Sequence, residues 1–214
     1  PKAYNPPHRP RAGHTGNVNR ANSPKRLYLR PGATFDKYKA FVVRFKSGHV
    51  TIGQRVPGKR MKSNPKKEAV KELEVGIEAA GILHEKGCDL AGTGEMGIGN
   101  TTTSSAVISV LTGLDPEVVT GAGLDHAGLR RKIEVIKEGI RIHRPDPSDG
   151  IDVLSKVGGL DLAALTGFYL GCAYWRIPVV LDGLITGAAA LAAVKLCPAV
   201  ADYLLASHVS AEPA

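Results

Sequence analysis

The chain has 214 residues, enough for one α/β domain or for a domain with an appendage. Its net charge of +8 originates in the first third of the chain: residues 1–67 hold 17 Lys/Arg and one acid, whereas residues 68–214 hold 11 Lys/Arg and 19 Asp/Glu. No apolar run of about 18 residues is free of charge or glycine and no signal peptide is visible, so we predict no membrane span.

Residues 1–33 are rich in proline and in basic side chains, with six prolines, seven Lys/Arg and no acid. Such a segment cannot bury enough apolar surface to offset its ordering entropy, so we expect disorder there. Residues 40–45 and 49–52 are typical of a strand pair turned at Ser47 and Gly48. We therefore divide the chain into a basic, largely irregular segment at 1–62 and a globular unit at 63–214.

Regular elements become clear from Asn64 onward. Asn64 as N-cap, Pro65 in the first turn and Gly87 after the last turn predict a helix over 65–86. One apolar face of it consists of Val70, Leu73, Ile77 and Ala80.

Helices and short apolar strands alternate after this helix. The predicted elements are a strand at 88–92, helices at 101–112, 127–143 and 161–175, a strand at 177–181, and a helix at 184–205 that Pro198 bends or divides. Short apolar strands between helices indicate a parallel sheet, so we predict an α/β fold with an incomplete, doubly wound, mostly parallel sheet and helices on both faces. Ligands of such sheets bind beyond the carboxyl ends of the strands. The loops after 88–92 and 177–181 should therefore face one site.

The first of these loops, residues 94–103, reads Gly-Glu-Met-Gly-Ile-Gly-Asn-Thr-Thr-Thr. Gly94 and Gly97 let the backbone approach a ligand, and Asn100 is a natural N-cap for the next helix. A strand, a glycine loop and a helix N-terminus together form an anion site, most often for phosphate. Glu95 would be repulsive there unless it binds sugar hydroxyls or handles a proton. A glycine-rich turn with a surface glutamate is the alternative.

Known phosphate motifs do not fit this loop. The Gly-Lys-Ser/Thr of a Walker loop is absent, the glycine spacing is not that of the dinucleotide fingerprint, and the paired acids of diphosphate-using phosphoribosyltransferases are missing. The three cysteines, Cys88, Cys172 and Cys197, lie far apart in apolar stretches and predict reduced, buried thiols of a cytoplasmic protein. The histidines lack the spacing of metal ligands, so we expect no metal and no cofactor.

Other candidate residues follow the second strand or begin helices. Asp182 suits ligand binding or helix capping, and Gly183 would offer its N–H to a ligand. Residues 149–161 either line the pocket or make a turn and the N-cap of the next helix. Lys132 belongs to a basic triplet that is more typical of a solvated face than of an anion contact. Ser207 and His208 lack the nucleophile elbow that presents a catalytic serine.

Residues 94–102 closely resemble the signature of the nicotinate-nucleotide–dimethylbenzimidazole phosphoribosyltransferases, which assemble the lower ligand of cobalamin. Residues 149–159, 178–183 and 207–212 match three further motifs of that family, in the expected order. The resemblance runs from about Glu68 to the C-terminus. It implies a large domain with a doubly wound parallel sheet, transfer of phosphoribose from nicotinate mononucleotide to 5,6-dimethylbenzimidazole, and a homodimer.

The chemistry of that transfer implies what the loops must do. Nicotinate leaves a pyridinium glycoside without a proton, whereas the incoming benzimidazole nitrogen loses one and needs a base. Positive charge on the ribose C1′ is stabilised by a nearby carboxylate. The resemblance implies that Glu95 lies by the ribose with Asp182 nearby. It assigns the 5′-phosphate to the following groups: the N–H groups of Gly97 and Gly183, Lys132 and Ser210.

The sequence also departs from the family. The family's catalytic base is a glutamate in a Leu-Gly-Glu-Gly segment beyond the Ser-His-x-Ser-Ala-Glu motif, and the 214 residues end before it. We therefore interpret the chain as a fragment that binds nucleotide or phosphate with little or no turnover. The family's N-terminal part has no counterpart in residues 1–62, which we interpret as an out-of-frame segment or, alternatively, as a fused basic module.

Two other functions stay open. The basic N-terminal segment is compatible with a nucleic-acid-binding protein, although few aromatic residues are interleaved with its charges. A non-catalytic domain that binds a nucleoside monophosphate is the second alternative. The four ordered motifs favour the phosphoribosyltransferase interpretation over both.

Overall fold

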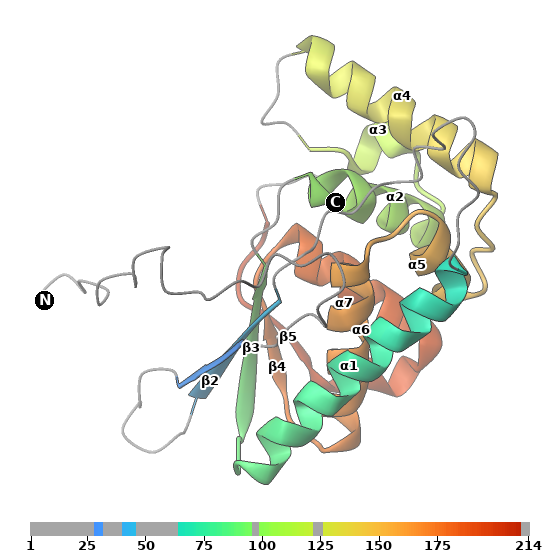
Figure 1. The fold of residues 1–214 in the computed structure, drawn as a ribbon. Coiled ribbons are helices and arrows are strands. Elements are labelled where there is room, and N and C mark those ends of the chain that lie inside the picture. Colours follow the sequence, from blue (N-terminus) through green and yellow to red (C-terminus); the bar gives the residue numbers. More distant parts are fainter. Residues whose placement is uncertain (1–27, 32–39, 46–63, 96–98, 122–125, 211–214) are drawn as a thin grey trace, which may run out of the picture.

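The structure, a computed structural model, describes residues 28–31, 40–45, 64–95, 99–121 and 126–210 (Figure 1). Its strands are β1 (Tyr28–Pro31), β2 (Ala40–Phe45), β3 (Leu90–Glu95), β4 (Val179–Leu181) and β5 (Leu204–Ala206). They form one open sheet in the order β1-β2-β3-β4-β5. The pair β1–β2 is antiparallel and the other three pairs are parallel. The predicted α/β class with a mostly parallel sheet is confirmed.

The first strands correct the expectation for the N-terminal segment. β1 lies within residues 1–33, which were expected to be irregular, and β2 matches the first strand of the predicted pair. The predicted partner at 49–52 falls outside the described residues. β2 pairs instead with β1 on one side and with β3 on the other, where Val42 lies opposite Gly92.

Helices make up most of the remaining described residues. They are α1 (Pro65–Glu85), α2 (Asn100–Thr112), α3 (Pro116–Val119), α4 (His126–His143), α5 (Gly150–Lys156), α6 (Leu160–Tyr174), α7 (Leu184–Leu196) and the 3-10 helix η1 (Pro198–Tyr203). None of these described helices is both long and apolar enough to cross a membrane. The predicted helices at 65–86, 101–112, 127–143 and 161–175 are confirmed, whereas α3 and α5 occupy segments in which no helix was expected.

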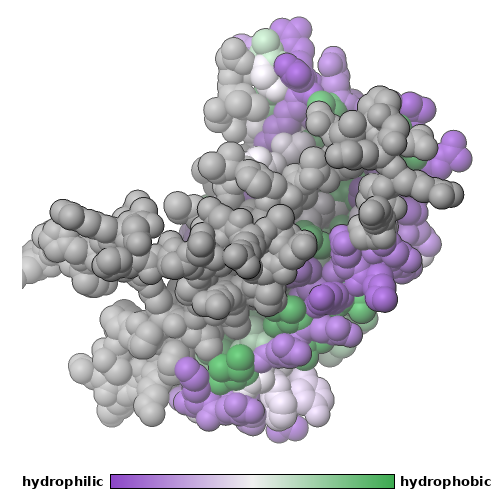
Figure 2. All heavy atoms as spheres, in the orientation of Figure 1, coloured by the Kyte–Doolittle hydropathy of each residue, from purple (hydrophilic) through white to green (hydrophobic). Residues whose placement is uncertain are grey.

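The N-cap predicted for α1 is confirmed, and its predicted apolar face is confirmed in part. The Asn64 side chain accepts hydrogen bonds from the backbone N–H groups of Lys66 and Lys67. Leu73 and Ala80 are buried as predicted, whereas Val70 and Ile77 are 37% and 43% exposed. The outer sides of α1 and α4 are mainly hydrophilic, with scattered hydrophobic residues (Figure 2). The face that packs inward thus combines leucines with small residues and leaves out Val70 and Ile77.

Small residues explain which face of α1 is buried, because α1 packs closely on α6. The backbones of the two helices are so near that a β-carbon on Gly76 would collide with the carbonyl oxygen of Ala164. A β-carbon on Gly167 would likewise collide with the carbonyl oxygen of Leu73. The largest fully buried side chains of the described part include Tyr169 and Phe168, which lie on α6. The contact between α1 and α6 thus joins the first crossover helix to the centre of the core.

The helical cover of the sheet lies on one face in the part of the chain that the structure describes. Thr93 on β3 shares a hydrogen bond with Tyr169 of α6 and is buried. Leu90, whose side chain alternates to the opposite face, is 37% exposed. Since the strand order follows the chain and crossovers are right-handed, successive connecting helices gather on the same face.

The C-terminal elements also differ from the prediction. The expected long helix at 184–205 ends at Leu196, and Pro198 begins η1, which is followed by the unpredicted edge strand β5. Cys88, Cys172 and Cys197 are free thiols, but Cys197, after the last turn of α7, is exposed and not buried as expected. Burial raises the pKa of the Cys172 thiol well above its usual range, so this thiol stays protonated.

The close contact between α1 and α6 predicts that one added methyl group at the contact strongly destabilises the protein. Gly167→Ala should lower the free energy of unfolding by about 3 kcal/mol, because two backbones must separate to accept the β-carbon. The matched control is Gly139→Ala in α4, where nothing lies within 4 Å of the added β-carbon. There, the higher helix propensity of alanine should stabilise the protein by about 0.5–1 kcal/mol. Urea unfolding of both variants measures the difference, and equal stability would contradict the packing described.

Candidate functional site

The carboxyl ends of β3 and β4 lie side by side, as the sequence predicts. Ala91 pairs with Val179 and Gly92 pairs with Val180. A β-carbon on Gly94 would lie 3.9 Å from a carboxylate oxygen of Asp182, so the two strand ends are in van der Waals range. Two of the predicted site residues, which are far apart in sequence, thus meet at one edge of the sheet.

Hydroxyl groups beneath these strand ends tie the sheet to the helices. The Thr93 and Tyr169 hydroxyl oxygens are 3.0 Å apart, and Thr93 Oγ1 also donates to the carbonyl oxygen of Val180 at 3.3 Å. Burial raises the pKa of the Tyr169 phenol well above its usual range, so it stays neutral and able to donate. These contacts fix β3, β4 and α6 relative to one another directly below the site.

The glycine loop differs from its prediction at both ends. β3 extends to Glu95, three residues beyond the predicted strand, so Glu95 belongs to the last position of a strand and not to a loop. Gly99, with φ of +87°, is the N-cap of α2, and Asn100 is already in the first turn. The prediction of Asn100 as N-cap is therefore wrong. Gly97, which was assigned to the phosphate, lies outside the described residues.

The side chain of Asn100 bridges two carboxylates instead of capping the helix. Its Nδ2 donates to Glu95 Oε2 and, at 3.0 Å, to Asp161 Oδ2. Glu95 ends β3, Asn100 begins α2 and Asp161 lies in the first turn of α6. Asn100 and Asp161 are almost completely buried, at 3% and 2% exposure. One amide group thus connects three segments at the edge of the predicted site.

Sequence reasoning missed Asp161 as a site residue. The segment 149–161 was expected to form a pocket wall or a turn with an N-cap, and both expectations hold in part. Asp149 caps α5 by accepting from the N–H groups of Ile151 and Asp152, and Lys66 lies 2.6 Å from its carboxylate and lowers its pKa. Asp161 reaches the site. An acid within a helix that is otherwise almost entirely apolar was the signal that could have marked it.

Lys132 reaches the start of α2, which supports its predicted position. Lys132 Nζ donates to Thr101 Oγ1 at 3.0 Å and therefore places an ammonium group at the first turn of α2. The other two members of the basic triplet, Arg130 and Arg131, are exposed, so Lys132 alone of the three points toward the loop. A lysine beside a helix N-terminus, where backbone N–H groups are free, favours an anion at this place.

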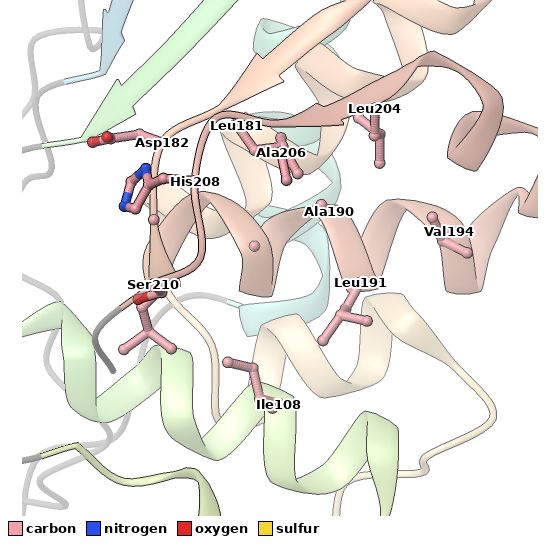
Figure 3. A pocket seen from close by; sticks show the side chains of 13 residues that line it. Ile108, Leu181, Asp182, Ala190, Leu191, Val194, Leu204, Ala206, His208 and Ser210 are labelled. Carbon is pink, nitrogen blue, oxygen red and sulfur yellow. The ribbon is translucent and has the colours of Figure 1, made fainter. Parts of the chain in front are cut away.

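The remaining predicted residues line one pocket of about 400 Å³ (Figure 3). Asp182, His208 and Ser210 lie at its polar end, and Gly183 also lines it. The opposite end is apolar and is lined by side chains of α7 and β5, among them Val194 and Leu204 (Figure 3). The structure therefore brings three predicted residues, Asp182, Gly183 and Ser210, into one cavity.

Two contacts modify the predicted roles within this pocket. The N–H of Gly183 donates to Thr186 Oγ1 at 2.9 Å, so a phosphate could receive this hydrogen bond only after Thr186 gives it up. Ser207 Oγ lies 2.7 Å from His208 Nδ1 and donates to the carbonyl oxygen of Asp182 at 3.2 Å. The hydrogen bond from Ser207 to Asp182 stabilises the loop after β4. In the described ranges no three His, Cys, Asp or Glu side chains converge as metal ligands.

Comparison with known proteins shows clear relatives. Residues 59–214 match a family model described as phosphoribosyltransferase. The chain is 60% identical over 148 residues to a nicotinate-nucleotide–dimethylbenzimidazole phosphoribosyltransferase of Ruminiclostridium cellulolyticum and 57% identical over 148 residues to one of Clostridium acetobutylicum. Each match covers 68% of this chain and 42% of the relative. The chain thus spans less than half the length of these curated relatives.

A solved structure agrees with this result. The crystal structure of a protein of the same name from Thermus thermophilus superposes with a TM-score of 0.64 at 40% sequence identity. The match covers 69% of this chain and 44% of that one. The resemblance found in the sequence motifs is therefore confirmed by overall similarity in both sequence and structure.

The hydroxyl contacts below the strand ends predict a measurable cost of removing one oxygen atom. Tyr169→Phe should lower the free energy of unfolding by about 1–2 kcal/mol, because the buried Thr93 hydroxyl loses one of its two hydrogen-bond partners and keeps only Val180. Tyr174→Phe is the control, since Tyr174 is 76% exposed and should change stability by less than about 0.5 kcal/mol. Thermal or urea unfolding compares the two. Identical midpoints would show that the Thr93–Tyr169 contact contributes nothing.

Proposed function

Because this chain belongs to the nicotinate-nucleotide–dimethylbenzimidazole phosphoribosyltransferase family, we propose that it supplies the phosphoribose-binding part of such an enzyme. The reaction transfers phosphoribose from nicotinate mononucleotide to 5,6-dimethylbenzimidazole and yields α-ribazole 5′-phosphate and nicotinate. One observation carries the proposal. The ammonium group of Lys132 contacts Thr101 and the carboxylate of Glu95 contacts Asn100, so a positive and a negative group both lie at the start of α2.

The phosphate half of the nucleotide belongs at the start of α2. Lys132 and backbone N–H groups at the start of α2 would provide positive charge and donors for a 5′-phosphate. Gly97 is assigned to the same group by family resemblance. Ser210 and Gly183 line the neighbouring pocket, and Thr186 is the group that a phosphate replaces at the Gly183 N–H.

The ribose half belongs at the ends of β3 and β4. Glu95 occupies the last position of β3, and the exposed carboxylate of Asp182 lies within van der Waals range of Gly94. Two carboxylates at this edge suit the ribose hydroxyls and the positive charge that grows on C1′ as the bond to the nicotinate nitrogen breaks. The pair of electrons of that bond leaves with nicotinate, and the benzimidazole nitrogen forms the new bond to C1′.

The incoming benzimidazole nitrogen also loses a proton. We assign Glu95 to the ribose and not to this proton, because Asn100 holds its carboxylate in place. The expectation drawn from the sequence is therefore retained as a proposal: the 214 residues bind the mononucleotide with little or no turnover. The homodimer stays a prediction from family resemblance, and the cytoplasmic location stays a prediction from the cysteine pattern. The nucleic-acid alternative rests mainly on residues outside the described ranges.

Titration of nicotinate mononucleotide tests the phosphate assignment. Lys132→Ala should weaken binding at least tenfold, because a hydrogen bond between two charged groups is lost. Arg131→Ala is the matched control. The side chain of Arg131 is exposed and carries the same charge as its neighbour Lys132, so its removal should change the dissociation constant less than about threefold. Isothermal titration calorimetry measures both. Equal losses would show that only the overall charge matters, and a wild-type chain that binds no nucleotide would refute the proposal.

Product formation tests the expected absence of turnover. Wild-type chain, incubated with nicotinate mononucleotide and 5,6-dimethylbenzimidazole, should yield no α-ribazole 5′-phosphate above a protein-free control, because no described residue is assigned to accept the proton. Chromatography with absorbance detection separates the product from both substrates. Product that grows with protein concentration and disappears in Glu95→Ala would show that the chain contains a complete active site.

A further inference from the structure

We propose that Asp161 is a positioning residue that holds Glu95 in place through the side-chain amide of Asn100. The inference rests on the proposed function, since Glu95 is the carboxylate assigned to the ribose. Asp161 itself does not touch the nucleotide in this scheme. It acts on the site through one intermediate side chain.

The amide nitrogen of Asn100 has two hydrogens, and each has a separate carboxylate acceptor. One is Glu95 Oε2 and the other is Asp161 Oδ2, at 3.0 Å. An ionised carboxylate only accepts hydrogen bonds, so both acceptors select the nitrogen end of the amide and exclude its oxygen end. With one acceptor the amide can rotate about it. With two acceptors on different segments, the plane of the amide is fixed.

Burial protects the hydrogen bond between Asn100 and Asp161 from competition by water. Asn100 is 3% exposed and Asp161 is 2% exposed, so water does not compete for either side chain. Asp161 Oδ1 is buried as well and accepts no hydrogen bond from the described residues. A carboxylate that is kept at such a position requires an explanation, because burial without full hydrogen bonding is costly.

The simplest alternative is that Asp161 only stabilises α6. It lies in the first turn of that helix, where a negative charge is favourable. The N-cap is Gly159, which has no side chain to cap the helix, so an acid in the first turn would stabilise it. This alternative depends on the charge of Asp161 and needs no contact with Asn100. The positioning role depends on an acceptor oxygen at the place of Oδ2, and charge is not required.

A fixed Glu95 matters for the proposed reaction because the carboxylate must lie at a set distance from C1′. Groups that stabilise a developing charge are effective when they are already oriented before the reaction. Glu95 is the last residue of β3, and its carboxylate accepts a hydrogen bond from Asn100. Through Asn100 this contact reaches α6, which is packed in the core.

Two substitutions at one position separate the two roles. Asp161→Asn removes the charge and keeps an acceptor oxygen for Asn100, whereas Asp161→Ala removes both. The positioning role predicts that Asp161→Ala weakens binding of nicotinate mononucleotide about tenfold, and that Asp161→Asn weakens it less than about threefold. If only the charge at the helix terminus matters, both variants lose affinity equally, and the proposal fails. Urea unfolding of each variant shows whether it is folded at the temperature of the titration.

A measurement without nucleotide keeps this inference separate from the proposed function. In nuclear magnetic resonance spectra, the two side-chain amide protons of Asn100 should both be shifted downfield and exchange slowly with solvent. Asp161→Ala should release one of them, Glu95→Ala the other, and Asp161→Asn neither. Asn100 protons that are unchanged in Asp161→Ala would overturn the positioning role. If these signals behave as expected but the wild-type chain binds no nucleotide, the proposed function fails and the contact itself stands.

Discussion

The parallel pairing of β3 with β4 is the contact on which the site depends. Their paired residues, Ala91 with Val179 and Gly92 with Val180, come from parts of the chain that are separated by five helices, α2 to α6. Thr93 strengthens the pairing through its side chain, which donates to the carbonyl oxygen of Val180. Because parallel strands end at the same edge, this register sets Gly94 beside Asp182. Glu95 and Asp182, which end β3 and follow β4, lie at the same edge of the sheet for this reason.

The strands and helices of the core were largely predictable because they carry local signals. Asn64 and Pro65 begin α1, and Gly87, with φ of +66°, follows its end, as the turn chemistry of these residues requires. The buried face of α1 was predictable from hydrophobicity only in part, at Leu73 and Ala80. Gly76 lets α1 approach α6 until backbones touch, so the smallest residues mark the interface and Val70 and Ile77 remain exposed. Such a contact depends on the partner helix, which no single segment reveals.

The site was predictable where one segment holds all of its parts. Glu95, Asn100 and the glycines between them share ten residues, and the loop was recognisable for that reason. The partners of these residues were not. Lys132 comes from α4 and Asp161 from α6, and only the packing of these helices brings them to the start of α2. From spacing along the sequence, each residue also had an interpretation without a ligand. Lys132 could be a solvated charge, and Asp161 could belong to the start of a helix. Tertiary contacts show where the two side chains lie, at the start of α2.

The strand order has a consequence for how the protein is made. From β1 to β5, each strand joins the edge that the preceding strand left open, so the sheet can grow in the direction of synthesis. Glu95 leaves the ribosome before α2 to α6, and β4 and Asp182 follow only after these helices have been translated. The nascent chain therefore carries an unfinished site while the five helices are made, and ligand recognition must wait for β4.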